Sequence, residues 1–140
     1  MINIYTDGAY SAVTKRGGWS FYCKEFNVKV CGSSTDPTTN NRMEMTAVLK
    51  ALQFLEMANI REKEITIWSD SLYVINTMDN IYQKKTNCDL WHELDEAVHR
   101  LLFSKVYFKH VKGHAENKDN NTVDFLANLM SQQNAYTRTN

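Results

Sequence analysis

Proline and glycine, which are frequent in disordered and fibrous chains, are scarce in this sequence. Its 140 residues include one proline and five glycines, and 43% of them are hydrophobic. This composition excludes a disordered chain. The sequence has no internal repeat, low-complexity tract or linker. We therefore expect a single domain over residues 1–140, long enough to bury a core.

Cysteines and long apolar runs are equally scarce. The three cysteines are odd in number, and their spacing matches no metal-binding motif, so we expect free thiols in a reducing compartment. No hydrophobic run is long enough to span a membrane, and the first residues do not resemble a signal peptide. These observations predict an intracellular, cytoplasmic protein without a membrane partner.

An excess of charge of either sign is also missing. The sequence carries sixteen basic and sixteen acidic side chains, and its net charge is formally zero. Bulk charge therefore does not indicate nucleic-acid binding. If four of the acids bound metal ions, sixteen basic and twelve acidic side chains would remain. The metal-loaded protein would then present a mildly basic surface to a polyanion.

Hydrophobic periodicity predicts an α/β fold with a mixed sheet. The pattern changes from strand-like to helical and back along the chain, in the order β-β-β-α-β-α-α-β-α. The expected strands are residues 2–6, 19–24, 28–31, 65–68 and 106–108, and the expected helices are residues 41–58, 71–78, 89–102 and 122–133. We expect three antiparallel strands, two further strands parallel to the first, and about four flanking helices.

Four acidic residues stand at prominent places in this pattern: Asp7, Glu44, Asp70 and Asp124. Asp7 and Asp70 are expected at the ends of two parallel strands, and sites form beyond such strand ends. Glu44 and Asp124 are expected in the first turns of helices that can point to the same edge. Converging carboxylates repel one another unless cations neutralise them. Two divalent ions about 4 Å apart would suit phosphodiester hydrolysis.

Each acid also has a structural alternative. Asn41 and Glu44 could form a capping pair at a helix start. Asp70 could be a simple helix cap, and Asp124 could favour a helix dipole by its position. Asp7 could begin a turn. Only the four acids together indicate a metal site.

The motifs around these acids resemble the type 1 ribonuclease H family. They are Thr6-Asp7-Gly8-Ala9, Thr39-Asn40-Asn41-Arg42-Met43-Glu44, Ser69-Asp70-Ser71, and Val111-Lys112-Gly113-His114-Ala115 followed by Asp124. The resemblance covers nearly the whole chain in the family's motif order. It implies a ribonuclease H-like fold and a monomeric endoribonuclease. The expected reaction is hydrolysis of the RNA strand of RNA–DNA hybrids, leaving 5′-phosphate and 3′-hydroxyl ends.

The resemblance also implies roles for the site residues. Asp7, Glu44, Asp70 and Asp124 would hold two Mg²⁺ ions, with Mn²⁺ as a substitute, and Asp7 would bridge both ions. His114 would handle protons or help to release the product. The alternative for His114 is a solvated loop histidine.

Substrate contacts follow from the same resemblance. Asn40 and Asn41 match residues that read the minor groove, where a protein meets the 2′-hydroxyl of RNA. Thr39 and Asn87 match two members of a pocket for a DNA phosphate. Pro37 replaces an arginine that is common in this pocket, which predicts weaker binding of the phosphate.

A basic handle found in many relatives is absent. Only residues 77–88 connect the second and third expected helices, and Lys84 and Lys85 are the charged pair of this connection. We expect these lysines, with Lys15 and Arg16, to replace the handle in part. Its loss should lower hybrid affinity and the salt dependence of binding.

Two other functions share these features: a catalytically weak hybrid-binding domain, and a DNA-acting nuclease of the same fold. The intact carboxylates argue against the first. The pair Asn40-Asn41 and the sequence Lys112-Gly113-His114 argue against the second. Fold alone does not separate these functions.

Overall fold

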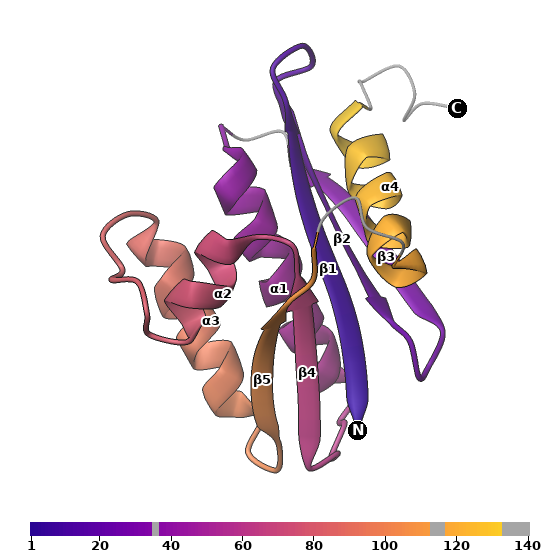
Figure 1. Ribbon diagram of the computed structural model, residues 1–140, viewed down its shortest axis with the longest axis vertical. Coiled ribbons are helices and arrows are strands. Elements are labelled where there is room, and N and C mark those ends of the chain that lie inside the picture. Colours follow the sequence, from indigo (N-terminus) through magenta and orange to yellow (C-terminus); the bar gives the residue numbers. More distant parts are fainter. Residues whose placement is uncertain (35–36, 113–116, 133–140) are drawn as a thin grey trace.

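A five-stranded mixed sheet forms the centre of the protein (Figure 1). The computed structural model describes residues 1–34, 37–112 and 117–132. The strands are β1 (Ile2–Ser11), β2 (Arg16–Cys23), β3 (Val28–Ser34), β4 (Glu64–Ser69) and β5 (Lys105–His110), arranged in the order β3-β2-β1-β4-β5. Strands β1 to β3 are antiparallel, whereas β4 and β5 run parallel to β1. The predicted fold class and strand directions are confirmed.

Within the described residues, four helices cover the two faces of this sheet. They are α1 (Asn40–Met57), α2 (Leu72–Met78), α3 (Cys88–Arg100) and α4 (Lys118–Gln132). Successive residues of a strand point to opposite faces. A side chain added at Gly17 of β2 would meet Met43 of α1, whereas one at Gly18 would meet Ala127 of α4. Helices α1 and α4 therefore lie on opposite faces, and α3 packs beside α1 (Figure 1).

The main hydrophobic core lies between the sheet, α1 and α3. Apolar residues recur every three or four positions along α1, so that one face of the helix is buried. The largest fully buried side chains of this core include Met45, Leu52, Leu55, Ile65, Ile67, Trp91 and Leu94. On the opposite face, Val123 and Ala127 seal α4 against the sheet. None of the helices in the described part of the chain is long and apolar enough to cross a membrane.

Strand β1 continues beyond the position at which we predicted its end. Its antiparallel pairing with β2 extends to Ser11 opposite Arg16. Its parallel pairing with β4, however, ends at Thr6 opposite Ser69. Asp7 is thus the first residue past the parallel ladder, inside the strand rather than at its end. It remains level with the end of β4.

Helix α4 begins four residues earlier than predicted, at Lys118. The Asn117 Oδ1 atom accepts hydrogen bonds of 3.0 Å from the backbone N–H groups of Asp119 and Asn120. This contact caps the helix and fixes its start. Asp124 consequently lies in the second turn of α4, and its predicted place in the first turn is wrong.

Candidate active site

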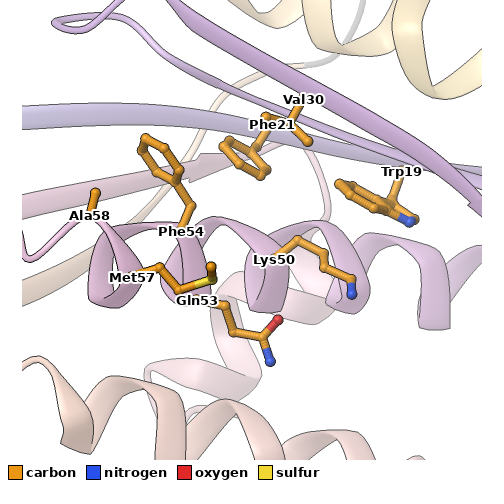
Figure 2. A pocket seen from close by; sticks show the side chains of 8 residues that line it. All are labelled: Trp19, Phe21, Val30, Lys50, Gln53, Phe54, Met57 and Ala58. Atoms are coloured by element: carbon orange, nitrogen blue, oxygen red, sulfur yellow. The ribbon is translucent and has the colours of Figure 1, made fainter.

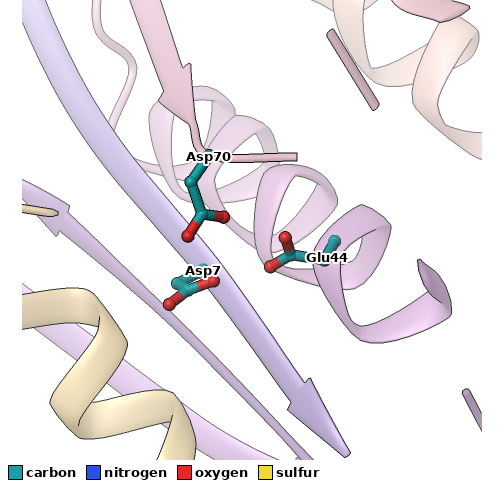
Figure 3. Close-up of side chains that lie close together, drawn as sticks. All are labelled: Asp7, Glu44 and Asp70. Atoms are coloured by element: carbon teal, nitrogen blue, oxygen red, sulfur yellow. The ribbon is translucent and has the colours of Figure 1, made fainter. Parts of the chain in front are cut away.

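Three carboxylates meet beside the end of β4. Asp7 comes from β1, Glu44 from the second turn of α1, and Asp70 follows β4 directly. Each offers an oxygen atom, and these atoms all lie within 4.8 Å of one another. Figure 3 shows the three side chains pointing toward a common space. Asp7 and Glu44 are 4% and 5% exposed, which is unusually low for acids.

A glycine next to Asp7 makes this approach possible. A Cβ atom at Gly8 would lie 2.2 Å from the carbonyl carbon of Met43 and 2.3 Å from the backbone nitrogen of Glu44. Only a residue without a side chain lets α1 pack so closely against β1. The Gly8 N–H donates to Glu44 Oε1 and lies 2.9 Å from Asp7 Oδ1. One backbone N–H thus sits between the two carboxylates.

Other side chains cap the neighbouring helices. Thr39 Oγ1 accepts from the Arg42 N–H at 3.1 Å and begins α1. Ser71 Oγ accepts from the Val74 N–H at 3.2 Å and begins α2. The alternatives in which Asp70 caps a helix, or Glu44 belongs to a capping pair, are therefore wrong. Neither carboxylate is used to cap a helix.

Burial changes the acidity of this cluster. Loss of hydration, aided by the charges of Asp70 and Asp124, raises the pKa of Asp7 from 3.8 to about 7. Burial and the neighbouring Asp7 raise the pKa of Glu44 well above its ordinary value. Both pKa shifts show that ionising these neighbouring, buried carboxyls together costs free energy unless a positive charge lies close to them. A bound cation would supply that compensation and lower both pKa values.

The fourth acid reaches the same space from the other face of the sheet. Asp124 lines a polar cavity of about 450 Å³ together with Asp7, Glu44, Asp70, Gly8, Ala9, Tyr10, Asn40, Ser71 and Asn128. Among the described residues, it lies outside the close group of three carboxylates. Helix α4, which carries Asp124, is held against β2 because Ser20 Oγ donates to the Val123 carbonyl at 2.5 Å.

The donor set fits hard divalent cations. The three close groups are all carboxylates, and hard cations such as Mg²⁺ and Mn²⁺ prefer oxygen ligands. The chain also brings the fourth carboxylate to the same cavity. A metal that requires thiolate or imidazole ligands has no matching donors among the described residues of this cavity.

The predicted substrate residues are divided among several places. Asn40 lines the acidic cavity, while Asn41 and Thr39 are exposed beside it at the start of α1. Asn87 lies at the start of α3 and contacts Arg42. His114 falls outside the described residues.

The two predicted lysines differ in their surroundings. Lys84 Nζ forms a 3.2 Å ion pair with Asp95 Oδ2, which reduces its free positive charge. Lys85 lines a separate cavity of about 430 Å³ beside Tyr73 and Tyr82. Lys85 is therefore the more available cation of the two.

Two contacts to the acids of the site were not predicted from the sequence. Asn128 donates through Nδ2 to the backbone and side-chain oxygens of Asp124, at 2.9 and 3.2 Å. Its spacing of four residues after Asp124 could have revealed this contact. His110 Nε2 lies 3.2 Å from the carbonyl oxygen of Asp70. That contact depends on the pairing of β4 with β5, which no local pattern predicts.

A larger cavity elsewhere lacks comparable chemistry. Its volume is about 510 Å³, and it lies between α1 and strands β2 and β3 (Figure 2). Its lining is mainly apolar and aromatic, with Trp19, Phe21 and Phe54. Among the described residues that line it, only Lys50 is charged. The carboxylate cavity is therefore the candidate active site.

Comparisons with known proteins agree with this assignment. The sequence model of the family described as RNase H matches residues 1–132. The chain is 37% identical over 145 residues to the ribonuclease H of Chlorobaculum parvum, covering 91% of this chain and 93% of the relative. It is 37% identical over 144 residues to that of Acetivibrio thermocellus, covering 90% and 91%.

A solved structure has a similar fold. It is LC11-RNase H1 in complex with an RNA/DNA hybrid, with a TM-score of 0.77. The match covers 92% of this chain and 95% of that chain at 22% sequence identity. At this level of identity the likeness supports the arrangement of the sheet and helices.

Proposed function

Because the chain belongs to the ribonuclease H family, we propose that its carboxylate cavity hydrolyses the RNA strand of RNA–DNA hybrids with two bound Mg²⁺ ions. The observation that carries this proposal is the convergence of Asp7, Glu44 and Asp70 from three separate parts of the fold. The relatives named ribonuclease H support the reaction, and the donor set supports the ions. Mn²⁺ is the expected substitute because it also prefers oxygen ligands.

In this proposal the chain's own residues hold and orient the reacting groups. Asp7, Glu44, Asp70 and Asp124 are the ligands, and Asp7 is central because each of the other three acids influences its pKa. The chemistry that such cations supply is Lewis-acid activation of water and stabilisation of charge on the leaving oxygen. The Gly8 N–H holds Glu44 in place. Asn128 holds the Asp124 carboxylate through its amide.

Recognition of the RNA strand is assigned to the first turn of α1. The Asn40 amide lies at the wall of the cavity and can both donate to and accept from a 2′-hydroxyl. Asn41 extends the same polar edge into solvent. We propose that His114 assists proton transfer or product release.

A cleavage assay with three substrates tests the proposal. Labelled RNA–DNA hybrid, double-stranded RNA and double-stranded DNA are incubated with Mg²⁺, Mn²⁺ or a chelator. We expect cleavage of the hybrid alone, in its RNA strand, with 5′-phosphate ends and no reaction in chelator. Asp7→Asn should reduce the rate by roughly 10³-fold or more, because one carboxylate is removed from the ligand set.

Glu96→Gln is the matched control, since it removes one exposed carboxylate from the distant helix α3. It should leave the rate unchanged. Cleavage that survives Asp7→Asn would disprove the ligand assignment. Binding of the hybrid without cleavage would favour the weak hybrid-binding domain, and cleavage of double-stranded DNA would favour the DNA-acting nuclease.

A further inference from the structure

A second group of side chains lies on the sheet, outside the acidic cavity. Successive residues of a strand point to opposite faces. Ile67 of β4 lies in the core shared with α1 and α3, so Trp68 points to the other face. The parallel register of β4 and β5 places Tyr107 beside Thr66 and Lys109 beside Trp68. Side chains of both strands therefore meet on the face that is turned away from the main core.

Helix α4 lies on this face but leaves β4 and β5 uncovered. Gly18 faces α4, and its ladder partner Ala9 points the same way as Tyr5, which pairs with Trp68. Helix α4 packs against β1, β2 and β3, and Figure 1 shows it at the β2–β3 side of the sheet, away from β5. Helices α1, α2 and α3 contribute to the core on the opposite face. Within the described residues, β4 and β5 thus have no helix over this face.

Aromatic rings and lysines lie together on the uncovered area. Trp68 Nε1 donates to Asn3 Oδ1 at 3.0 Å, which fixes the orientation of the indole. Lys109 Nζ lies 5.8 Å from the centroid of the Trp68 ring. Lys105 Nζ lies 5.3 Å from the centroid of the Tyr107 ring. We name this group of four residues the β4–β5 platform: Trp68, Lys105, Tyr107 and Lys109.

The chemistry of the platform complements a single strand of nucleic acid. Trp68 and Tyr107 are half-buried, whereas Lys105 and Lys109 are exposed. Within the described residues neither lysine forms an ion pair, so both charges are available to phosphates. Glu64 accepts from the Tyr107 hydroxyl at 3.3 Å, at the end of β4 that is far from the cavity. Aromatic side chains stack on unpaired bases, so the platform favours a single strand over a duplex.

The platform adjoins the acidic cavity. Trp68 precedes Asp70 by two residues, which is about 7 Å along a strand. His110 follows Lys109, and its Nε2 atom lies 3.2 Å from the Asp70 carbonyl oxygen. A nucleic-acid strand that leaves the cavity beside Asp70 therefore reaches Trp68 and Lys109 first.

We propose that the β4–β5 platform binds a single-stranded extension of the RNA strand, with bases stacked on Trp68 and Tyr107 and phosphates on the two lysines. This inference rests on the proposed function, because the RNA strand must pass through the carboxylate cavity. Stacking of a base on an aromatic side chain is stronger than an exposed cation–π contact. A base can therefore displace each ammonium group from its ring, and the released ammonium group then meets a phosphate.

Two other occupants of this face make different predictions. A second copy of the chain would bury the same rings, and self-association would then depend on protein concentration and on Trp68. A single-stranded extension of the DNA strand would use the same stacking chemistry, but it belongs to the strand that the carboxylates do not cleave. The experiment below separates both occupants from the RNA extension.

Binding is measured in the Asp7→Asn background, so that the RNA stays intact. Fluorescence anisotropy compares a blunt hybrid with hybrids that carry a single-stranded extension of about eight nucleotides, long enough to cover two rings. The extension is placed on the RNA strand, at either end, or on the DNA strand. An RNA extension at one of its two ends should lower the dissociation constant by about 5-fold or more near 100 mM salt. A DNA extension should change it by less than about 2-fold.

Substitutions in the platform should remove this gain and leave binding of the blunt hybrid unchanged. Trp68→Leu and Tyr107→Leu each remove a ring but keep an apolar side chain, so each should abolish most of the gain. Replacing Lys105 and Lys109 together by glutamine should reduce the salt slope for the extended hybrid by about 1.4, the value for two contacts to a single strand. Thermal melts check that each variant is folded, and Tyr107→Leu keeps the test decisive if Trp68→Leu unfolds.

Phe103→Leu is the matched control. Phe103 is 60% exposed, and the Arg61 guanidinium lies 4.7 Å from its ring centroid, so it is also a ring under a cation. It precedes β5, at the end of the strand that is far from the cavity. Phe103→Leu should therefore leave the gain from the RNA extension unchanged.

The inference is overturned if no RNA extension tightens binding, if the gain survives both ring substitutions, or if Phe103→Leu reduces it equally. A larger gain from the DNA extension would show that the assignment to the RNA strand is wrong. Sedimentation that reveals a dimer lost in Trp68→Leu would identify a second copy as the occupant. The proposed function fails in a different way, because the protein with all four acids would then not cleave the RNA strand. Cleavage of the blunt hybrid without any gain from an extension would remove only the platform.

Discussion

Asp7 shows how the chemistry of the site conflicts with stability. The residue is 4% exposed, and burial is the main reason why its pKa rises from 3.8 to about 7. The unfolded chain ionises this carboxyl above about pH 4, whereas the folded chain resists ionisation until about pH 7. The free energy of unfolding therefore falls as pH rises through this window. Above it, the full cost remains unless a cation is bound.

Asp7→Asn should consequently stabilise the protein in the presence of chelator. At about pH 8 we expect a melting temperature about 5 °C higher than that of the unsubstituted protein. The difference should shrink as pH falls toward about 4, where the carboxyl is protonated in the folded chain and partly protonated in the unfolded chain. Differential scanning calorimetry across this pH range provides the measurement.

Magnesium should reverse the order of stability. Ions that bind only the folded state stabilise it by mass action, and the neutral amide introduced by Asp7→Asn would be a weaker ligand than the carboxylate. Glu96→Gln, at an exposed position on α3, should show neither effect. Equal melting temperatures for Asp7→Asn and the unsubstituted protein in alkaline chelator would contradict the predicted cost.

The close packing of β1 against α1 at Gly8 can be tested by substitution. Gly8→Ala would place a methyl group 2.2 Å from the Met43 backbone, which cannot move aside as a flexible side chain could. We expect a loss of about 2–3 kcal/mol in the free energy of unfolding and a further loss of metal affinity, because Glu44 is displaced.

Gly32→Ala is the matched control. Its added methyl group would meet the Trp19 side chain at 2.5 Å, away from the carboxylates. It should cost stability but leave the metal concentration for half-maximal activity unchanged. Denaturant titration and metal titration together separate the two effects. If Gly8→Ala keeps its metal affinity, the close packing serves stability alone.

At the scale of elements, α4 depends on β2 for its position. Ser20 is fully buried, and its hydroxyl donates to the Val123 carbonyl beside Asp124. Thr14 makes a similar 2.5 Å bond to the Ser131 carbonyl at the other end of the helix. Ser20→Ala and Thr14→Val should each cost about 1 kcal/mol.

Only Ser20→Ala should also raise the metal concentration needed for half-maximal activity. The reason is that it releases the part of α4 that carries Asp124, whereas Thr14→Val releases the far end. Urea unfolding gives the stability, and activity at graded Mg²⁺ gives the metal requirement. Equal metal requirements for the two variants would show that the fourth acid does not depend on this contact.

The elements also show what local patterns can and cannot predict. Periodicity identified the five strands and four helices of the described residues, because alternation and helical stripes are local consequences of burying one face. It placed the end of β1 too early, since that end depends on pairing with β2 across a hairpin. It started α4 too late, because the cap comes from Asn117 outside the apolar stripe.

The same distinction applies to the site. Asp7 and Asp70 were expected to be neighbours because parallel strands end at one edge, and they are neighbours. The contact between Arg42 and Asp89 joins residues 47 positions apart on two helices. No local pattern encodes it, since it depends on how α1 and α3 pack.

At the scale of the whole molecule, the basic residues between α2 and α3 are candidates for contacting a polyanion. Lys84 is paired with Asp95, whereas Lys85 is exposed beside Tyr73 and Tyr82. Replacing Lys84 and Lys85 together by alanine should weaken hybrid binding by roughly 5-fold near 100 mM salt and reduce the salt slope by about one to two contacts.

Lys85→Ala alone should produce most of this change, because Asp95 already neutralises its neighbour. Anisotropy titrations at several salt concentrations give both quantities. Lys63→Ala, on the exposed segment before β4, is a suitable control. Unchanged binding and slope in the double variant would show that the connection between α2 and α3 does not contact the hybrid.

The four acids are divided evenly along the chain. Asp7 and Glu44 precede residue 58, while Asp70 and Asp124 follow residue 63, and the intervening segment is largely exposed. A chain cut within this segment would yield two fragments that each carry half of the proposed ligands and part of the core. If these four acids are the metal ligands, we expect that neither fragment acts alone and that activity returns only when the two fragments reassociate. If the two fragments were each fused to one of two partners, we expect that recovery of activity would report the joining of those partners.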